Sequence, residues 1–375
     1  MRVCFIQSTF HPFVGGTERQ SLQLAQRLIK KGVQVEVVTG RFSDLKKFEV
    51  VQGVPVHRVW AYDSHAKRSF LQTLTWLWSA FWFLLFSKSY DIYHAHQALT
   101  PAFIAYLIAK LKGKKCLSKI ANTQHVGELF ILSHSLFGRL MRSFILSMDG
   151  FIATSNQAVK ELAENKISKE KIAAIPNGVD TEKFKSVKDK KTLRKRLGLP
   201  LNKKIVMFLA TTTREKGIFE LVQAWKTVEA KVSNAHLIIV GKKFNEQELD
   251  NLVRKLGLHS IEFLGIHPNP EDFLAASDAF VLCSHAEGLS NALLEAMSSA
   301  LPIVATKISG TVDLIKDKKN GLLVPPMNTI ALSKALLSVL QKPSGWGKAA
   351  RETIISKYSL DAVVNQYLKL YKNLI

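Results

Sequence analysis

Short apolar runs alternate with longer amphipathic stretches along the whole chain, a pattern that is typical of strand–helix repeats around parallel sheets. In the first half, the apolar runs predict strands at Val3–Gln7, Val33–Val38, Val56–Trp60, Asp91–Ala95, Lys115–Ala121 and Gly150–Ala153. The periodic stretches between them predict helices at Thr17–Lys31, Pro101–Leu111 and near Phe137–Met148. The first half therefore predicts an α/β domain with a parallel sheet.

A turn-rich segment, Ile175–Asp180, and a lysine-rich stretch after it separate this series from a second one. The second series predicts strands at Lys204–Leu209, His236–Val240, Ile261–Leu264, Ala279–Leu282, Pro302–Ala305 and Leu322–Val324, and helices at Gly217–Ala230 and Asn291–Ala300. Because 375 residues exceed the usual size of one domain, we expect two, residues 1–175 and 176–357. The last amphipathic helix, about residues 358–375, is expected to pack back on the first domain.

Residues 70–86 form an uncharged run that contains Trp76, Trp78 and Trp82. Its length lies at the lower limit for a membrane-spanning helix. Basic residues flank the run on both sides, and basic flanks with tryptophans are typical of a helix that lies in a bilayer interface. Three interpretations therefore stay open: a buried helix of the α/β domain, an interfacial helix and a spanning helix.

The net charge of +22 predicts an anionic partner. The excess is spread along the chain, because Lys and Arg outnumber Asp and Glu by 23 to 12 in residues 1–180 and by 29 to 18 in the remainder. Nucleic acid is not expected, since the sequence has no motif of a nucleic-acid-binding module. A phosphorylated substrate and an anionic membrane remain as partners. The three separated cysteines and the lack of a secretory leader predict a cytoplasmic protein. Whether it also binds peripherally to the inner membrane face stays open.

The strongest chemical signal is the segment His285–Met297, where a predicted strand leads through a loop into a helix. Such a junction places backbone N–H groups and the positive end of a helix dipole at the carboxyl edge of a sheet, where anionic ligands bind. Glu287 lies in the loop and Glu295 in the helix, so two carboxylates are available for sugar and ribose hydroxyls. The residues alone fit an ordinary surface loop equally well.

Two glycines, Gly15 and Gly16, follow the first predicted strand and precede the first helix. They allow a positive φ and a close approach of the backbone to a phosphate or a sugar. A tight turn without ligand contact is the alternative. A dinucleotide site is not expected, because the spacing Gly-x-Gly-x-x-Gly is absent.

Several motifs occur together in an order that resembles the retaining glycosyltransferase family 4. The similarity covers nearly the whole chain and rests on Gly15-Gly16-Thr17-Glu18, Ile175-Pro176-Asn177-Gly178-Val179-Asp180, Glu215-Lys216-Gly217, Ala276-Ser277-Asp278, Glu287 to Glu295, Leu301 to Thr306, and Asn320 to Val324. The resemblance implies the GT-B fold, in which two Rossmann-like domains with parallel sheets face a central cleft. It also implies an N-terminal acceptor-side domain and a C-terminal domain that binds the nucleotide sugar.

The resemblance implies a role for each residue of the donor site. Glu287 is expected to contact the donor sugar and Glu295 the ribose, and Lys216 to neutralise the departing diphosphate. The last role agrees with physical chemistry, because a fixed cation offsets the charge that develops on such a leaving group. The backbone that is expected to hold the sugar and the diphosphate belongs to Gly288, Leu289, Ser290 and Asn291.

The chain departs from the family at two places. Relatives usually carry Gly-Arg ahead of the lysine, whereas this chain has Ala210-Thr211, and we expect Arg214 to supply the second charge instead. The family's first-domain histidine has no aligned equivalent. His125 is our preferred candidate for the group that meets the sugar, with Asn122 as the alternative, whereas His94 is expected to be a structural residue. His94, His96 and His125 all lie near the carboxyl ends of predicted strands, where they are expected to face the cleft.

The sequence therefore predicts a retaining glycosyltransferase that moves a sugar from a UDP- or GDP-sugar to a hydroxyl of a saccharide acceptor. The charge and residues 70–86 favour a lipid-linked acceptor, as in the assembly of cell-surface polysaccharides. No Asp-x-Asp motif occurs, so we expect no metal and no further cofactor. A sugar-nucleotide 2-epimerase and a non-catalytic binding subunit are the alternatives.

Overall fold

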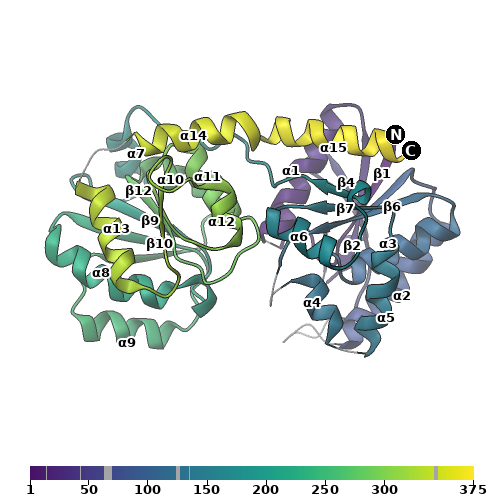
Figure 1. Cartoon of the computed structure of the whole chain (residues 1–375), viewed down its shortest axis with the longest axis horizontal. Coiled ribbons are helices and arrows are strands. Elements are labelled where there is room, and N and C mark those ends of the chain that lie inside the picture. The colour runs from purple at the N-terminus through teal and green to yellow at the C-terminus, as the bar shows by residue number, and fades with distance from the viewer. Residues whose placement is uncertain (14, 43, 63–69, 124–126, 135, 342–344) are drawn as a thin grey trace. The chain divides into compact units, whose positions relative to one another are not determined.

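The computed structural model describes every residue except 14, 43, 63–69, 124–126, 135 and 342–344. The chain forms two compact units (Figure 1). Unit 1 consists of Met1–Gly178 and Leu360–Ile375, and unit 2 consists of Val179–Ser359. The chain therefore passes from one unit to the other twice, because its last helix, α15 (Leu360–Leu374), belongs to unit 1.

Unit 1 contains an eight-stranded sheet with the order β3-β4-β2-β1-β5-β6-β7-β8. Its strands are β1 (Arg2–Ile6), β2 (Gln34–Arg41), β3 (Phe48–Val51), β4 (Val54–Trp60), β5 (Ile92–Ala95), β6 (Lys115–Ile120), β7 (Gly150–Ala153) and β8 (Ile172–Ala174). The central strands are buried on both faces, which explains why each reads as a continuous apolar run.

The edge strand β3 is a correction to the expected all-parallel sheet, because it runs antiparallel to β4. Gln52 and Gly53 connect the two strands, and both have positive φ, 49° and 85°. Two such residues form the tight turn whose twist suits a hairpin. The strand escaped prediction because its burial is patchy, with Phe48 and Val50 exposed.

Helices cover both faces of this sheet. On one face lie α2 (Phe70–Phe86), α3 (Thr100–Leu111), α4 (Glu128–Ser133), α5 (Leu136–Leu146) and α6 (Asn156–Glu164), which share one hydrophobic cluster with the strands. On the other face lie α1 (Gly16–Lys30) and α15, with Tyr367 and Tyr371 of α15 fully buried. The last helix thus completes the core of unit 1.

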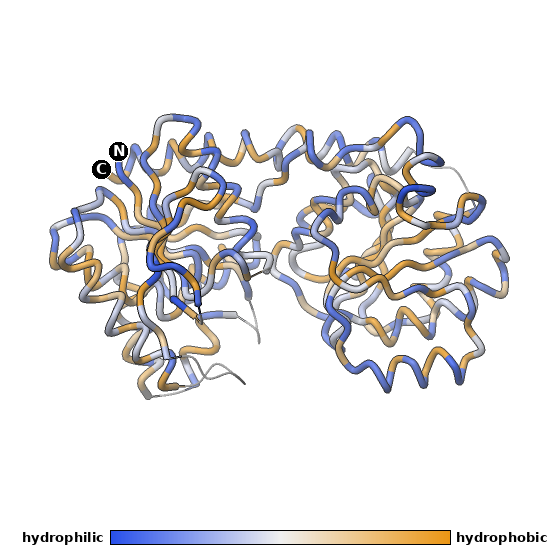
Figure 2. The backbone as a smooth tube through the Cα atoms, turned by 180° about the vertical axis from the view of Figure 1, so that it is seen from behind, coloured by the Kyte–Doolittle hydropathy of each residue, from blue (hydrophilic) through white to orange (hydrophobic). Residues whose placement is uncertain are grey.

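Unit 2 contains a six-stranded parallel sheet with the order β11-β10-β9-β12-β13-β14. Its strands are β9 (Lys204–Leu209), β10 (Ala235–Val240), β11 (Ile261–Gly265), β12 (Ala279–Leu282), β13 (Ile303–Thr306) and β14 (Leu322–Val324). Figure 2 shows the strands of both units as mainly hydrophobic, as expected for sheets that are buried on both faces.

Two groups of helices enclose the sheet of unit 2. One hydrophobic cluster joins it to α8 (Ile218–Lys231), α9 (Glu246–Leu256) and α13 (Thr329–Gln341). The other joins it to α7 (Lys190–Arg196), α10 (Pro270–Ala276), α11 (Asn291–Ser298), α12 (Ser309–Leu314) and α14 (Trp346–Lys357). Cys4, Cys116 and Cys283 are buried free thiols.

The order of strands reverses at one place in each sheet, between β1 and β5 in unit 1 and between β9 and β12 in unit 2. In parallel sheets with helices on both faces, ligands bind outside the carboxyl ends of the strands at this point. In unit 2, the topology therefore predicts a ligand site at the loops that follow β9 and β12.

Candidate active site

The loops after β9 and β12 bring Lys216 and Glu287 into direct contact. Lys216 ends a short helical turn after β9, and Glu287 lies in the loop between β12 and α11. The Lys216 Nζ donates to Glu287 Oε1 at 2.6 Å, and the Ser284 hydroxyl donates to the same oxygen at 2.9 Å. The two side chains are only 29% and 14% exposed, so water screens this ion pair weakly.

The two loops meet backbone to backbone at Gly217, where a side chain does not fit. Gly217 has a φ of 70°, and a Cβ there would lie 1.9 Å from the carbonyl oxygen of Cys283. The His285 N–H also donates to the carbonyl oxygen of Glu215 at 2.8 Å. These contacts fix the position of the backbone of Lys216 relative to the Glu287 loop.

The Glu287 loop ends at the N-terminus of α11. Ser290 caps this helix, because its hydroxyl accepts the N–H of Leu293. Leu289 and Ser290 are buried, and Glu295 is buried one turn further along the helix. The first N–H groups of a helix have no partner within the helix, so this end of α11 can donate to an anion.

Helix α12 supports the loop from the neighbouring strand. A Cβ at Gly310 would lie 1.4 Å from the carbonyl oxygen of Gly288, so α12 and the loop are in backbone contact. The Thr306 hydroxyl donates to the carbonyl oxygen of Ser284 at 2.6 Å. Sequence reasoning gave no role to Ser284, Gly310 or Thr306, because their contacts depend on which strands are neighbours.

Arg214 lies two residues before Lys216 and is largely exposed. Its guanidinium forms an ion pair with Glu248 of α9 and lies 4.4 Å from the ring centroid of Phe219 in α8. An exposed ion pair of this kind is worth at most about 1 kcal/mol. The guanidinium can therefore leave Glu248 for an anionic ligand at small energetic expense.

Gly15 and Gly16 form the start of α1 in unit 1. Gly15, the N-cap, does not use the positive φ that a glycine allows, because its backbone is extended with a φ of −137°. A Cβ at Gly15 would lie 2.2 Å from Oε2 of Glu18, and the other oxygen of this carboxylate, Oε1, accepts a hydrogen bond from the Thr9 hydroxyl at 2.6 Å. The space that a side chain would need here is occupied by that carboxylate.

Two of the histidines near the strand ends of unit 1 are buried. His94 Nδ1 lies 2.7 Å from the Tyr371 hydroxyl of α15, and the rings of His94 and His96 stack at 4.4 Å. Burial holds the pKa of both imidazoles well below the ordinary value, so both are neutral. His96 therefore does not face an open crevice, and His125 lies outside the described residues.

Sequence reasoning also missed Glu128, which fixes the backbone after β6. Its buried carboxylate accepts hydrogen bonds from the N–H groups of Ala121 and Asn122. The side chain of Asn122 is exposed. Burial raises the pKa of Glu128 to about 7. The nearby Lys119 is also buried, which lowers its pKa to about 8, and it donates to Asn177 Oδ1 at 2.7 Å. A glutamate in the first turn of a helix is the signal that could have identified this residue.

Asp278, from one of the shared motifs, has a structural role. It lies at the amino end of β12, opposite to the Glu287 loop, and accepts hydrogen bonds from the Arg194 guanidinium at 2.6 Å and from the Ile205 N–H at 2.8 Å. The carboxylate thus ties α7 and β9 to β12.

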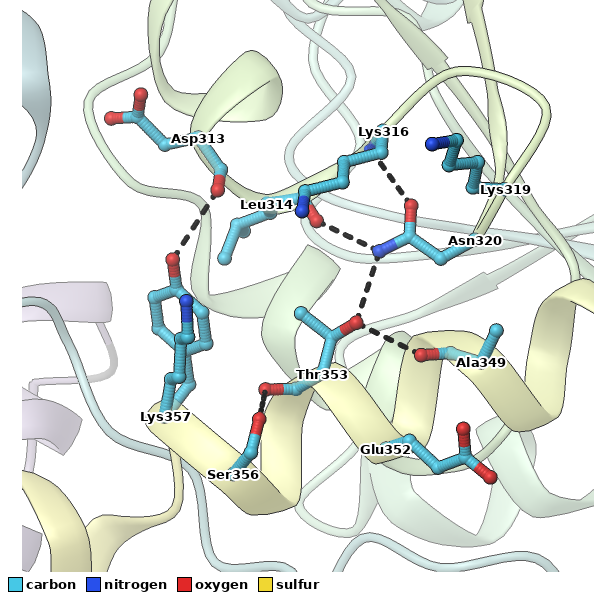
Figure 3. Close-up of a pocket in the computed structure, with 11 residues that line it drawn as sticks. Asp313, Leu314, Lys316, Lys319, Asn320, Ala349, Glu352, Thr353, Ser356 and Lys357 are labelled. Atoms are coloured by element: carbon cyan, nitrogen blue, oxygen red, sulfur yellow. Dashed lines mark hydrogen bonds between the residues drawn. The ribbon is translucent and has the colours of Figure 1, made fainter.

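Asn320, from another shared motif, also has a structural role. It is buried, and its amide donates to the carbonyl oxygen of Leu314 and to the Thr353 hydroxyl while its oxygen accepts the N–H of Lys316 (Figure 3). Asn320 thereby joins α12 and its following turn to α14, at the wall of a 410 Å³ pocket. No residue of the predicted donor site lines this pocket. Within the described ranges, no group of three or more His, Cys, Asp or Glu is placed to hold a metal ion.

Comparison with known proteins gives matches along almost the whole chain. The family model for glycosyltransferase family 4 matches residues 14–183, and the model for glycosyl transferases group 1 matches residues 189–357. Together they leave out only residues 1–13, 184–188 and 358–375.

Individual relatives agree with the family models. The chain is 25% identical over 372 residues to N-acetyl-alpha-D-glucosaminyl L-malate synthase of Bacillus anthracis, a match that covers 98% of this chain and 96% of the relative. It is 27% identical over 306 residues to the UDP-Gal:alpha-D-GlcNAc-diphosphoundecaprenol alpha-1,3-galactosyltransferase of Escherichia coli, with 78% of each chain covered. Among solved structures, Anabaena HepE in complex with UDP and glucose superimposes over 100% of both chains with a TM-score of 0.81 at 19% identity. The chain is therefore a glycosyltransferase of family 4 with the GT-B fold.

Proposed function

We propose that this enzyme transfers a sugar from a nucleotide sugar to a hydroxyl of a lipid-linked saccharide, with retention at the anomeric carbon, in the assembly of a cell-surface polysaccharide. The observation that carries the proposal is the Lys216–Glu287 pair, which lies where the strand order of unit 2 reverses and next to the N-terminus of α11. A cation, a carboxylate and the N-terminus of a helix at one such point suit a sugar diphosphate.

The donor replaces the internal ion pair with two separate interactions. Lys216 turns from Glu287 to the diphosphate. The Glu287 carboxylate then accepts hydrogen bonds from the sugar hydroxyls, and the Ser284 hydroxyl donates one to them. The backbone of residues 288–291 holds the diphosphate, and Glu295 accepts the ribose hydroxyls. The donor is a UDP- or GDP-sugar, and the UDP bound to Anabaena HepE supports the first of these.

The reaction exchanges one C–O bond for another on the same face of the sugar. The acceptor oxygen bonds to the anomeric carbon as the bond to the diphosphate breaks, and the acceptor proton passes to an oxygen of the departing phosphate. Lys216 and Arg214 stabilise the negative charge that builds up on that leaving group. We also assign Gly15 and Gly16 of unit 1 to donor binding, and His125 or Asn122 as the group that meets the sugar.

The acceptor is proposed from charge and from a relative. The Escherichia coli relative acts, by its name, on a diphosphoundecaprenol-linked sugar. The net charge of +22 suits both a diphosphate-linked lipid and an anionic membrane surface. We therefore assign the acceptor side to unit 1 and the nucleotide sugar to unit 2, and place the enzyme in the cytoplasm at the inner membrane face.

Arg214→Ala is expected to weaken donor binding about tenfold, because one of two cations that face the diphosphate is lost while the fold is unaffected. Calorimetric titration of the variant with the donor measures this change. Glu248→Ala is the matched control: it releases Arg214 from its ion pair and leaves donor binding unchanged or stronger. A near-normal donor Kd for Arg214→Ala would contradict the assignment of Arg214.

Transfer is expected to proceed without a divalent metal, because fixed cations and helix N–H groups take the place of a bridging ion. A screen of nucleotide sugars for thermal stabilisation identifies the donor. Product analysis with a polyprenyl diphosphate-linked saccharide is then run with EDTA and with Mn²⁺. Loss of transfer in EDTA that Mn²⁺ restores would refute metal independence. Release of a free epimerised sugar nucleotide, or donor binding without turnover, would refute glycosyl transfer.

A further inference from the structure

Helix α2 is mainly apolar, with Gln72, Thr73, Thr75 and Ser79 as its polar residues, although one side of it faces away from unit 1. It has 17 residues and no charged side chain. Trp76, Leu77, Ala80 and Leu84 are buried and belong to the hydrophobic cluster under the helix. A surface helix of a water-soluble domain normally presents polar residues on its other side.

The outer side of α2 carries only large apolar residues. The exposed positions of the helix are Phe70, Leu71, Leu74, Trp78, Trp82 and Phe86. Five of these are spaced four residues apart and so form one continuous stripe along the helix, which we call the aromatic stripe: Phe70, Leu74, Trp78, Trp82 and Phe86. Trp78 is 65% exposed and Phe86 is 80% exposed. Apolar surface that is gathered in this way marks a site of interaction.

The rings of the aromatic stripe support one another. Trp78 and Trp82 meet edge to face with centroids 5.5 Å apart, and Trp82 stacks on Phe86 at 5.6 Å. Side chains that are already held in place lose little conformational freedom on binding. The aromatic stripe is therefore prepared for contact with an apolar phase.

The part of the chain around the stripe is strongly cationic. Residues 64–148 contain ten Lys or Arg but only two acids, Asp91 and Glu128. Glu128 is buried, and Lys114 pairs with Asp91 at 3.8 Å. Lys88 and Lys115 pair with acids outside this range, Glu36 and Asp149, so the remaining basic residues supply the excess charge. Further exposed apolar side chains occur on α4 and α5, which share the helical layer of α2: Phe130, Ile131, Phe137 and Leu140.

We propose that the aromatic stripe docks unit 1 onto a bilayer that contains anionic lipids, with α2 lying in the plane of the interface. Tryptophan and phenylalanine beside basic residues are the side chains that such an interface takes up. None of the helices in the described part of the chain is long and apolar enough to cross a membrane. The proposal rests on the proposed function and deepens it, since a lipid-linked acceptor lies in a bilayer.

The test is sedimentation of the full-length chain with vesicles of phosphatidylcholine, with and without phosphatidylglycerol. We expect binding to the anionic vesicles that weakens as salt is raised. Trp78→Gln/Trp82→Gln is expected to weaken this binding at least about tenfold, since burial of one large apolar side chain alone is worth roughly that factor. Both tryptophans are exposed, so the variant keeps the core of unit 1.

The matched control is Ile330→Gln/Ile355→Gln, which removes two exposed apolar side chains from unit 2 and leaves vesicle binding unchanged. The proposal is overturned if the wild type stays in the supernatant with anionic vesicles, or if the tryptophan variant binds as the wild type does. It is also overturned if the wild type is a dimer in solution that the tryptophan variant separates, because the stripe is then a surface for a second copy. The assay contains no donor or acceptor, so the docking surface and the proposed transfer reaction fail separately.

Discussion

Lys216→Ala is expected to lower kcat by a factor of about 10² to 10³, the usual effect of removing one group that stabilises developing negative charge. The reason is the position of Lys216, which ends the turn after β9 beside the Glu287 loop, where the diphosphate of the donor is proposed to bind. The side chain is partly exposed, so its removal leaves the core of unit 2 intact. Steady-state transfer rates at saturating donor measure kcat, and calorimetry measures the donor Kd.

Two variants accompany this measurement. Lys216→Arg retains the positive charge and is expected to recover a large part of the lost kcat, which a purely structural role would not predict. Lys226→Ala removes an exposed lysine of α8 in the same unit and is expected to leave kcat unchanged. Because Lys216 and Glu287 contact each other, the effects of Lys216→Ala and Glu287→Gln are expected not to add in the double variant. An unchanged kcat in Lys216→Ala would remove Lys216 from the reaction.

The regular part of the fold is readable from the sequence because burial on both faces leaves an unbroken apolar run. The strands β9, β12 and β14 begin and end where the apolar runs predict. The hairpin strand β3 breaks the rule, because an edge strand is covered on few sides and keeps exposed residues. Its connection, Gln52-Gly53, was the local signal that could have revealed it.

The candidate site was only partly predictable. Glu287 and Lys216 were identified as residues, but their contact spans 71 positions and follows from the order of the strands, which places β9 beside β12. The contact of His94 is also long-range, since its partner Tyr371 lies 277 positions further along the chain. Asp278 and Asn320 show the opposite case. Both belong to motifs shared with the family, but their hydrogen bonds hold structural elements together and do not form the site.

Gly310→Ala is expected to lower kcat/KM by a factor on the order of 10² and to raise the donor Kd, although the residue touches no proposed substrate atom. The added Cβ would lie 1.4 Å from the carbonyl oxygen of Gly288 and 3.2 Å from the Cα of Leu289. Both neighbours are backbone atoms, so no side chain can rotate away, and the loop that carries Glu287 must shift. A displacement of about 1 Å at a reacting group is enough for a loss of this size.

Gly345→Ala is the matched control, because Gly345 lies at the start of α14 in the same unit, has a φ of −72°, and has open space where its Cβ would be. The control is expected to bind the donor as the wild type does and to unfold at an equal or slightly higher temperature, since alanine restricts the unfolded chain. Circular dichroism of both variants shows whether unit 2 is folded. If folded Gly310→Ala binds the donor normally, α12 yields instead of the loop, and the rigid support that we assign to the Glu287 loop does not exist.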